Sequence, residues 1–184
     1  PVEGEEGIEL HIRLNERNEY LKEIFAQAKQ QGVLKIKAPY GKVIYRQEPN
    51  LPFIFVAGGT GFVPIKALIE QALMQNDQRK IFLYWGVKTS QQYYLQELID
   101  RWAKNIPNFQ YIPVVSEAND AWQGKTGLVH DAVLSDHNDL SEFQVYVSGP
   151  PDMVLTAQKT FLKQGLKPQY IYSDTFELFA DEVH

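Results

Sequence analysis

From residue 53 onward the chain alternates between short, continuous apolar runs and amphipathic segments, and this alternation constrains the fold most. A strand buried on both faces of a sheet has a continuous apolar sequence, and such burial is typical of parallel sheets. The runs cover residues 53–57, 81–85, 109–115 and 143–147, with a shorter one at 170–172. Each step from one run to the next is about 30 residues, the length of a β-α-β unit.

Between these runs, apolar residues recur at helical spacing and predict four amphipathic helices. The apolar stripes lie at 65–73, 95–102, 128–133 and 154–162. Right-handed crossovers between parallel strands place such helices on both faces of a sheet. The sequence therefore predicts an α/β domain over residues 53–184, with an open, mainly parallel sheet and helices on both faces.

The first 48 residues follow a different pattern. Apolar and polar side chains alternate over residues 8–14, which is typical of a strand with one solvated face. Apolar residues at helical spacing over 20–28, followed by Gly32, predict a helix with a glycine cap. A second strand is predicted at 33–37 and a turn at 39–41. We interpret this segment as the tail of an antiparallel domain, which a proline-containing linker separates from the second domain.

The charge and composition of the chain exclude several classes of partner. The formal net charge is −5 and no basic run occurs, so the attraction that drives non-specific nucleic-acid binding is missing. The apolar runs are far shorter than the roughly 20 residues needed to cross a bilayer. The chain starts at Pro1 without an initiator methionine or a signal-peptide pattern. We therefore expect a segment of a longer, soluble, cytoplasmic protein with no nucleic-acid or membrane partner.

The absence of cysteine excludes disulfides, iron–sulfur clusters held by thiolates and cysteine zinc sites. The four histidines lack metal-ligand spacing, so no metal site is predicted. No Gly-x-Ser-x-Gly nucleophile motif occurs, and hydrolysis has no support. Redox chemistry in this chain would need an organic cofactor, and hydride transfer needs little acid–base help from the protein.

The first apolar run of the second domain leads into Gly58, Gly59, Thr60 and Gly61, and Pro64 follows shortly after. Glycines let the backbone approach a ligand closely, and the start of the next helix offers free N–H groups to a phosphate. We expect Pro64 at the first position of that helix. The residues match neither a Walker loop nor Gly-x-Gly-x-x-Gly. They predict a phosphate-binding loop, and a tight turn without a ligand is the alternative.

A second loop of this kind follows the fourth apolar run, where Ser148, Gly149 and Pro150 precede a predicted helix. Pro151 can open that helix and Asp152 can cap its first turn. A well-capped helix without a ligand is the alternative. Because the carboxyl ends of parallel strands share one edge of the sheet, the two loops together favour a dinucleotide that spans them.

A third element follows the second apolar run, where Rossmann dehydrogenases often have an acid that binds the ribose. No acid stands there, and the residues after Gly86 include Lys88, Thr89 and Ser90. These side chains can contact a ribose or a 2′-phosphate of a bound nucleotide. The alternative is a solvated lysine beside a helix cap.

Five short motifs occur in a fixed order: VAGGTGF at 56–62, YWG at 84–86, WQGKTG at 122–127, SGPPDM at 148–153 and SDTFE at 173–177. As an ordered set they resemble the ferredoxin–NADP reductase superfamily, most of all its bacterial NAD(P)H-flavin reductases, with deoxy-sugar reductases second. The resemblance covers nearly the whole chain. It implies a flavin-dependent oxidoreductase that transfers a hydride from NAD(P)H to a flavin, either FAD or FMN.

The resemblance also implies roles for individual residues. Those expected to bind the nucleotide are Gly58, Gly59, Thr60, Gly61, Gly86, Lys88, Gly149, Pro150, Asp152 and Met153. Ser148 is expected beside the nicotinamide, although many relatives have cysteine at this position. Phe176 matches a family position near the flavin, and a packed core phenylalanine is the alternative.

The family's flavin-binding motif lies upstream of the segment that residues 8–14 match. By this resemblance, residues 1–48 are the C-terminal part of an antiparallel flavin-binding barrel and residues 53–184 are the NAD(P)H-binding domain. We expect little flavin binding and little turnover from this chain alone. The expected partners are flavin, as substrate or prosthetic group, and a downstream electron-acceptor protein.

Two other functions stay open at this point. The first is a nucleotide-binding or partner-docking module without turnover of its own. The second is a phospho-accepting signalling domain on a similar sheet, for which a cluster of acids at the strand ends is missing.

Overall fold

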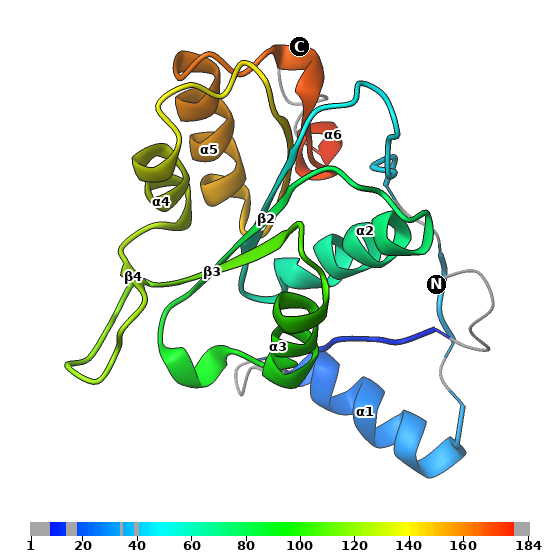
Figure 1. Ribbon diagram of the computed structural model, residues 1–184. Helices are drawn as coiled ribbons and strands as arrows, with labels where there is room; N and C mark the ends of the chain where they lie inside the picture. The colour runs from blue at the N-terminus through cyan, green and yellow to red at the C-terminus, as the bar shows by residue number, and fades with distance from the viewer. Residues whose placement is uncertain (1–7, 14–17, 34, 39–40, 179–184) are drawn as a thin grey trace.

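The computed structural model describes residues 8–13, 18–33, 35–38 and 41–178. Within these residues, six strands form one sheet in which every paired neighbour runs parallel (Figure 1). The strands are β1 (Phe53–Gly58), β2 (Ile81–Val87), β3 (Phe109–Val115), β4 (Lys125–Thr126), β5 (Gln144–Ser148) and β6 (Ile171–Tyr172). The α-helices are α1 (Glu19–Gln31), α2 (Phe62–Met74), α3 (Gln96–Asn105), α4 (Val129–Asp136), α5 (Pro151–Lys163) and α6 (Thr175–Leu178).

The order of strands across the sheet is β4-β3-β2-β1-β5-β6. From β1 the chain adds β2, β3 and β4 on one side, and it then crosses back to add β5 and β6 on the other. Ala57 of β1 consequently pairs with Trp85 of β2 and with Ser148 of β5. This change of direction leaves a crevice at the carboxyl ends of β1 and β5, where open α/β sheets bind their ligands.

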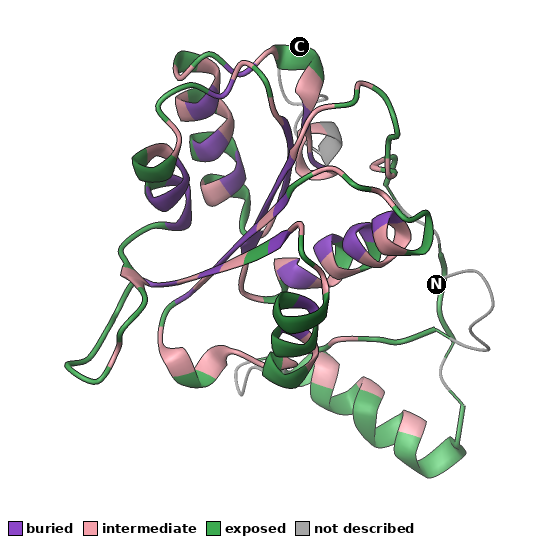
Figure 2. Cartoon of the chain, in the orientation of Figure 1, coloured by how far each residue is buried: buried purple, intermediate pink, exposed green. Residues whose placement is uncertain are grey.

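Helices cover both faces of the sheet, as the sequence predicts. Alternate side chains of a strand point to opposite faces. Phe53 and Phe55 therefore pack into the core formed with α2 and α3, whereas Ile54 and Val56 pack into the core formed with α4 and α5. Figure 2 shows the buried residues gathered on the central strands and on the helices beside them. The continuous apolar runs are thus buried on both sides.

The predicted elements of the second domain are confirmed with small shifts at their ends. α2 begins at Phe62, so Pro64 occupies its third position and not its first. A proline is tolerated there because the first four N–H groups of a helix have no acceptor within it. No apolar run predicts β4, which consists of the two residues Lys125–Thr126. Within the described ranges, no helix is both long and apolar enough to span a bilayer.

Among the first 48 residues, the predicted helix is confirmed. The side chain of Asn18 accepts the N–H of Leu21 at 3.1 Å at the start of α1. Gly32 ends the helix in the left-handed conformation, with φ of 67°, and donates to the carbonyl oxygen of Ala28 at 2.9 Å. None of the residues of α1 is buried. Its local signals are therefore complete, while its apolar face has little to pack against.

The prediction of two strands in this region is wrong for the residues that the structure describes. Residues 8–13, and the described part of 33–37, form no strand. A strand requires the backbone groups of a neighbour, and none of the six described strands lies beside either segment. The rest of these predictions, at Leu14, Leu34, Pro39 and Tyr40, lies outside the described residues.

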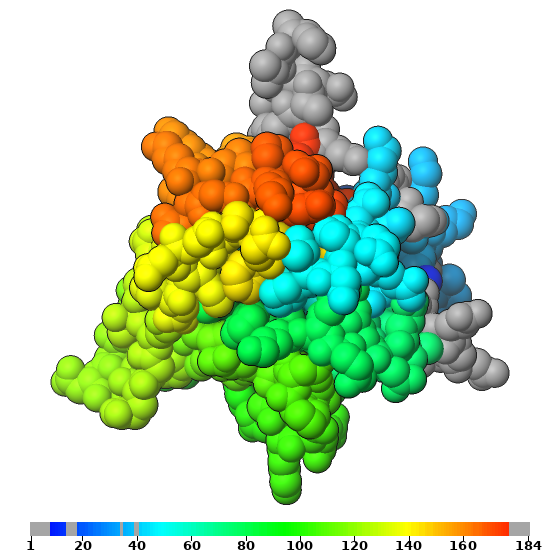
Figure 3. Space-filling view, turned by 45° about the horizontal axis from the view of Figure 1, so that its top comes forward, coloured from blue at the N-terminus to red at the C-terminus, as the bar shows by residue number. Residues whose placement is uncertain are grey.

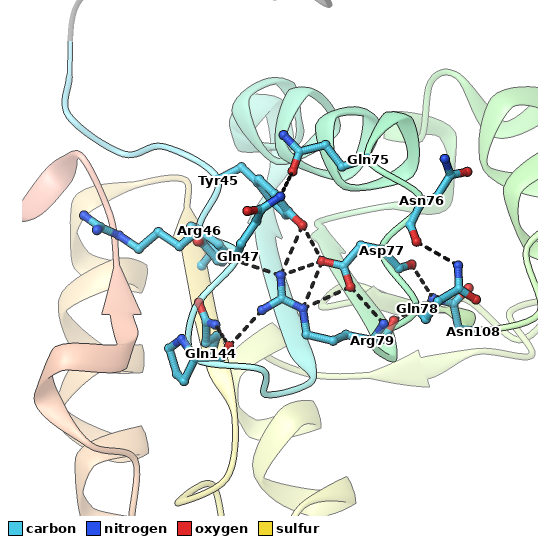
Figure 4. A network of polar contacts seen from close by, with 12 residues as sticks. Tyr45, Arg46, Gln47, Gln75, Asn76, Asp77, Gln78, Arg79, Asn108 and Gln144 are labelled. Atoms are coloured by element: carbon cyan, nitrogen blue, oxygen red, sulfur yellow. Dashed lines mark hydrogen bonds and ion pairs between the residues drawn. The ribbon is translucent and has the colours of Figure 1, made fainter.

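The linker before β1 is held against the amino ends of the strands by a buried ion pair (Figure 4). The guanidinium of Arg79 donates to the carbonyl oxygens of Arg46 at 3.0 Å and Pro49 at 2.8 Å. Asp77 accepts hydrogen bonds from Arg79 and from the hydroxyl of Tyr45. Only 7% of the Arg79 side chain and 9% of the Asp77 side chain are exposed. The linker is thus part of the packed domain.

Burial and hydrogen bonding act on the carboxyl of Asp77 in opposite directions. Burial alone would raise its pKa, but the hydrogen bonds from Arg79 and Tyr45 outweigh burial and lower the pKa.

The side-chain amide of Gln144 also donates to the carbonyl oxygen of Pro49. Figure 3 shows the linker, in cyan, beside the yellow segment that leads into β5. Contacts from two distant segments therefore hold the linker.

Candidate functional site

Aromatic side chains support the glycine loop that follows β1. Trp85 of β2 donates its indole N–H to the carbonyl oxygen of Gly59 at 2.9 Å. The ring of Phe62 stacks on that of Trp85, with centroids 4.2 Å apart. The hydroxyl oxygen of Tyr93 lies 3.0 Å from the carbonyl oxygen of Trp85 and 2.9 Å from that of Val114, so its one hydrogen is shared between these two acceptors. The loop therefore rests on a layer of packed, hydrogen-bonded rings.

Gly59 has the conformation and the surroundings that suit a bound phosphate. Its φ of 56° is left-handed, and a Cβ placed there would meet nothing within 4 Å. Gly59, Thr60 and Gly61 form a 3₁₀ turn that leads into α2, and no side chain of the described residues caps the start of either helix. The N–H groups at such a helix start carry partial positive charge and attract anions. Open space and an uncapped helix start thus meet at Gly59.

The neighbouring glycine, Gly61, has a different role that the sequence does not predict. A Cβ at Gly61 would lie 2.3 Å from the carbonyl oxygen of Ser148. The loops after β1 and β5 therefore pack directly on each other, and Gly61 permits their close approach. α5 begins at Pro151, as predicted; Asp152 lies in its first turn, but no side-chain hydrogen bond caps this helix start among the described residues.

Both loops open into one cleft of about 970 Å³ at the crevice beside β1 and β5. This volume lies within the range of about 300–1,000 Å³ that is typical of small-molecule sites. The predicted nucleotide-binding residues that line the cleft are Gly58, Gly59, Thr60, Gly61, Gly86, Lys88, Gly149, Pro150, Asp152 and Met153. Ser148 lines it as well. The structure thus brings the whole predicted set together in one place.

Lys88 has an acidic neighbour that the order of the sequence does not reveal. Its Nζ lies 3.8 Å from Oε1 of Glu117, and both side chains are largely exposed. The backbone N–H of Glu117 also donates to the carbonyl oxygen of Lys88 at 2.7 Å. The end of β3 therefore places a carboxylate beside the lysine, and this carboxylate would compete with a phosphate for it.

Several cleft residues have no counterpart among the sequence predictions. They are Arg13, Gln92, Ser116, Thr156 and the stretch from Gly127 to His130. Gly127 belongs to the motif at 122–127, so a signal for that wall existed. Arg13 lies in a segment predicted only as a strand, and nothing in its sequence context indicates a cleft position. Arg13 and Lys88 supply positive charge to the cleft, and Asp152 supplies negative charge.

Phe176 is the predicted site residue that the structure does not bring into the cleft. It lies on α6 and packs, partly buried, against the core on the α4 and α5 side of the sheet. That position agrees with the alternative of a packed core phenylalanine, and a place near a flavin stays a prediction. Among the described residues, no group of three His, Cys, Asp or Glu side chains is placed to hold a metal ion.

Comparison with known proteins adds the family. Residues 55–159 match the family model described as oxidoreductase NAD-binding domain. A CDP-6-deoxy-L-threo-D-glycero-4-hexulose-3-dehydrase reductase of Yersinia pestis is 40% identical over 94% of this chain and 52% of its own length. An NAD(P)H-flavin reductase of Vibrio harveyi is 32% identical over 96% of this chain and 76% of its own length.

Solved structures agree with this comparison. The cytochrome P450 reductase GcoB of Amycolatopsis superposes with a TM-score of 0.66 and 27% identity, over 71% of this chain and 39% of that one. The chain spans about half the length of the first curated relatives that it matches. The matched family model runs from within β1 to within α5 and includes both loops. The chain therefore belongs to the oxidoreductase NAD-binding domain family.

Proposed function

We propose that this domain binds NAD(P)H in the cleft beside β1 and β5 and presents it for hydride transfer to a flavin, FAD or FMN. The observation that carries the proposal is the meeting of the two predicted loops at adjacent carboxyl ends of parallel strands. A dinucleotide is long enough to lie across both. The relative named NAD(P)H-flavin reductase supports the direction of electron flow.

The pyrophosphate would lie on the loop after β1. Gly59 offers open space there, and the start of α2 offers N–H groups and the positive end of a helix dipole. The cation Arg13 also lines the cleft. These features fit an anionic group without a metal ion.

The nicotinamide would lie beside Ser148, Gly149 and Pro150. When bound, NAD(P)H supplies the hydride, and the protein has to orient it and to exclude water. The half-buried Ser148 carries a hydroxyl that suits hydrogen bonding to a ligand. Met153 lies near the loop, since its Sδ would be 2.6 Å from a Cβ at Gly58, and it adds an apolar surface to this end of the cleft.

The remaining expectations belong to the same proposal. Residues 1–48 would be part of a flavin-binding domain, and residues 53–184 would hold the nucleotide. A downstream electron-acceptor protein and a cytoplasmic location also stay predictions. The apolar side chains exposed before residue 48 favour a further packing surface for this segment.

Calorimetric titration of NADPH and NADH tests the proposal. We expect both to bind, with NADPH slightly favoured through Lys88. Lys88→Ala should lower the affinity for NADPH by about threefold and leave the affinity for NADH unchanged, because one exposed charge contributes only about 0–1 kcal/mol to binding. Glu117→Gln is the matched variant, and it should strengthen NADPH because it frees the lysine from its ion pair.

Each other outcome has a distinct meaning. If neither nucleotide binds, the cleft is not a dinucleotide site and the proposal is wrong. If Lys88→Ala lowers the affinity for NADPH and for NADH equally, Lys88 does not bind the 2′-phosphate. If the complete protein binds NADPH but does not oxidise it with added flavin, the domain is a binding module.

A further inference from the structure

The carboxylate of Asp174 makes two hydrogen bonds that the proposed function does not use. Its Oδ1 accepts the backbone N–H groups of Lys42 at 2.9 Å and Val43 at 3.0 Å. Asp174 belongs to the motif at 173–177, near the C-terminal end of the described residues, whereas Lys42 and Val43 precede β1. Hydrogen bonds to an ionised acceptor are about twice as strong as neutral ones. One side chain thus joins the segment before β1 to the C-terminal part of the described residues.

Gly41 makes this contact sterically possible. Its φ is 90°, in the left-handed region, and a Cβ placed there would lie 2.4 Å from Oδ1 of Asp174. A side chain at residue 41 would therefore displace the carboxylate and strain the backbone. Gly41 and Asp174 form a complementary pair in which the glycine leaves room and the carboxylate binds the turn that follows.

The bound turn adjoins the wall of the nucleotide cleft. A small cavity of about 40 Å³ lies between them, and its lining includes Val43, Pro64, Ser148 and Asp174. Pro64 and Ser148 also line the nucleotide cleft. A turn that moved away from Asp174 would therefore change the packing directly behind two cleft residues.

Asp174 directly precedes α6, the helix that carries Phe176. The N–H of Thr175 donates to the hydroxyl oxygen of the buried Ser173 at 3.3 Å, and the N–H of Phe176 donates to the carbonyl oxygen of Ser173 at 3.2 Å. Asp174 is thus anchored on its own side before it reaches across to Lys42 and Val43. The connection between the two segments is short and has few free torsions.

We propose that Asp174 is a positioning residue, whose carboxylate fixes the turn at 41–43 behind Ser148 and so sets where the segment preceding β1 lies relative to the cleft. The inference rests on the proposed function, because the segment that it positions is the one assigned to the flavin side. Asp174 acts through the backbone N–H groups of Lys42 and Val43. It therefore affects the rate of hydride transfer more than the affinity for the nucleotide.

The test compares Asp174→Ala with Asp174→Asn in the complete protein. Amide hydrogen exchange at Lys42 and Val43 reports the contact itself, and steady-state NADPH oxidation with riboflavin reports its consequence. In Asp174→Ala we expect faster exchange at both amides and about a tenfold lower kcat, because small displacements of reacting groups are costly. The KM for NADPH should stay within about twofold, since the glycine loop is untouched. Asp174→Asn keeps an acceptor oxygen and should restore most of both readouts.

Asp139→Ala is the matched control. Asp139 binds a turn in the same way, since it accepts the backbone N–H of Ser141 at 2.8 Å and its hydroxyl at 3.0 Å, but it lies before β5, far from the cleft. The kcat of Asp139→Ala should equal that of the wild type. Unchanged exchange at Lys42 and Val43 in Asp174→Ala would overturn the proposal. The proposal would also be wrong if Asp174→Asn had a kcat as low as that of Asp174→Ala while the amides of Lys42 and Val43 stayed protected from exchange. In that case the carboxylate would act chemically and not by holding the turn.

The failure of the proposed function looks different from these outcomes. A wild-type complete protein that oxidises no NADPH with flavin would refute that function and, with it, the positioning role in that reaction. The exchange rates at Lys42 and Val43 would still decide whether Asp174 holds the turn.

Discussion

Helices α1 and α2 have 13 residues each, but they are stabilised in different ways. α1 has a side-chain cap from Asn18 at its start and a left-handed Gly32 at its end, and none of its residues is buried. α2 has no side-chain cap at its start among the described residues, yet five of its residues are buried. Local signals define the first helix, and packing against the sheet defines the second.

The same contrast holds for the two regions that contain these helices. Of the large hydrophobic side chains that are exposed in the described residues, eight lie before residue 48 and three lie after it. Exposed apolar side chains concentrated in one segment favour a surface that packs against something else. The contrast shows that an amphipathic pattern predicts an element, while the neighbours of that element decide whether its apolar face is buried. Four predictions test this difference, from the largest expected effect to the smallest.

The largest effect should come from completing the first region. We predict that this chain alone is nearly inactive as a flavin reductase, and that a protein extended upstream of Pro1 gains at least about a thousandfold in turnover. Hydride transfer needs the two rings held roughly 3–3.5 Å apart, which requires an ordered flavin pocket. NADPH oxidation with added riboflavin or FMN measures the difference. Comparable turnover in both proteins would show that residues 1–48 need no partner surface.

Truncating one phenylalanine in each region compares their packing directly. Phe55 on β1 is completely buried, whereas Phe25 on α1 is 39% exposed. Phe55→Ala should lower the free energy of unfolding by about 3–5 kcal/mol, because it leaves a cavity in the core. Phe25→Ala should change it by less than about 0.5 kcal/mol. Urea denaturation of both variants provides the measurement, and equal losses would show that α1 is as well packed as β1.

Two glycines with nearly the same backbone conformation separate binding from folding. Gly59 and Gly32 have φ of 56° and 67°, and a Cβ at either would meet nothing within 4 Å. Gly59→Val should weaken NADPH binding by about a hundredfold, because its side chain fills the space proposed for the pyrophosphate. Gly32→Val carries a similar backbone strain but should leave the affinity unchanged. Calorimetry measures the affinity of each variant, and a far-UV spectrum checks that each is folded. Equal NADPH affinities in the wild type and Gly59→Val would show that this loop does not bind the nucleotide.

The smallest effect concerns charge pairs and their dependence on pH. The folded-state pKa of Asp77 is lowered, so its contribution to stability is complete above the unfolded-state pKa, about 3.9, and is lost as pH falls through the lower folded-state pKa. Asp77→Asn should therefore cost about 2 kcal/mol at pH 7, and progressively less below pH 4. Glu19→Gln removes the exposed pair with Lys22 and should cost less than about 0.5 kcal/mol. If the loss of unfolding free energy caused by Asp77→Asn stays constant down to pH 2, the ionised carboxylate of Asp77 is not the source of this stability.

Much of the fold was predictable because its signals are local. The run at 109–115 predicts β3 at the residues that it occupies, and Pro151 marks the first residue of α5. The candidate site was predictable for the same reason, since glycines and prolines at the ends of apolar runs mark both loops. β4 could not be predicted, because two polar residues have no periodicity. The place of Arg13 in the cleft and of Glu117 beside Lys88 could not be predicted either, since both are contacts between distant segments.

The sequence by itself determined that this chain forms parallel strands with covering helices, and that two glycine-containing loops end two of those strands. Periodicity and turn chemistry act over a few residues, so a single segment contains all the information needed. Only the tertiary structure decided that β1 and β5 are neighbours, that Gly61 lies against Ser148, and that Asp174 binds the turn before β1. These choices depend on burial and hydrogen bonding between segments up to 132 residues apart, which no local pattern specifies.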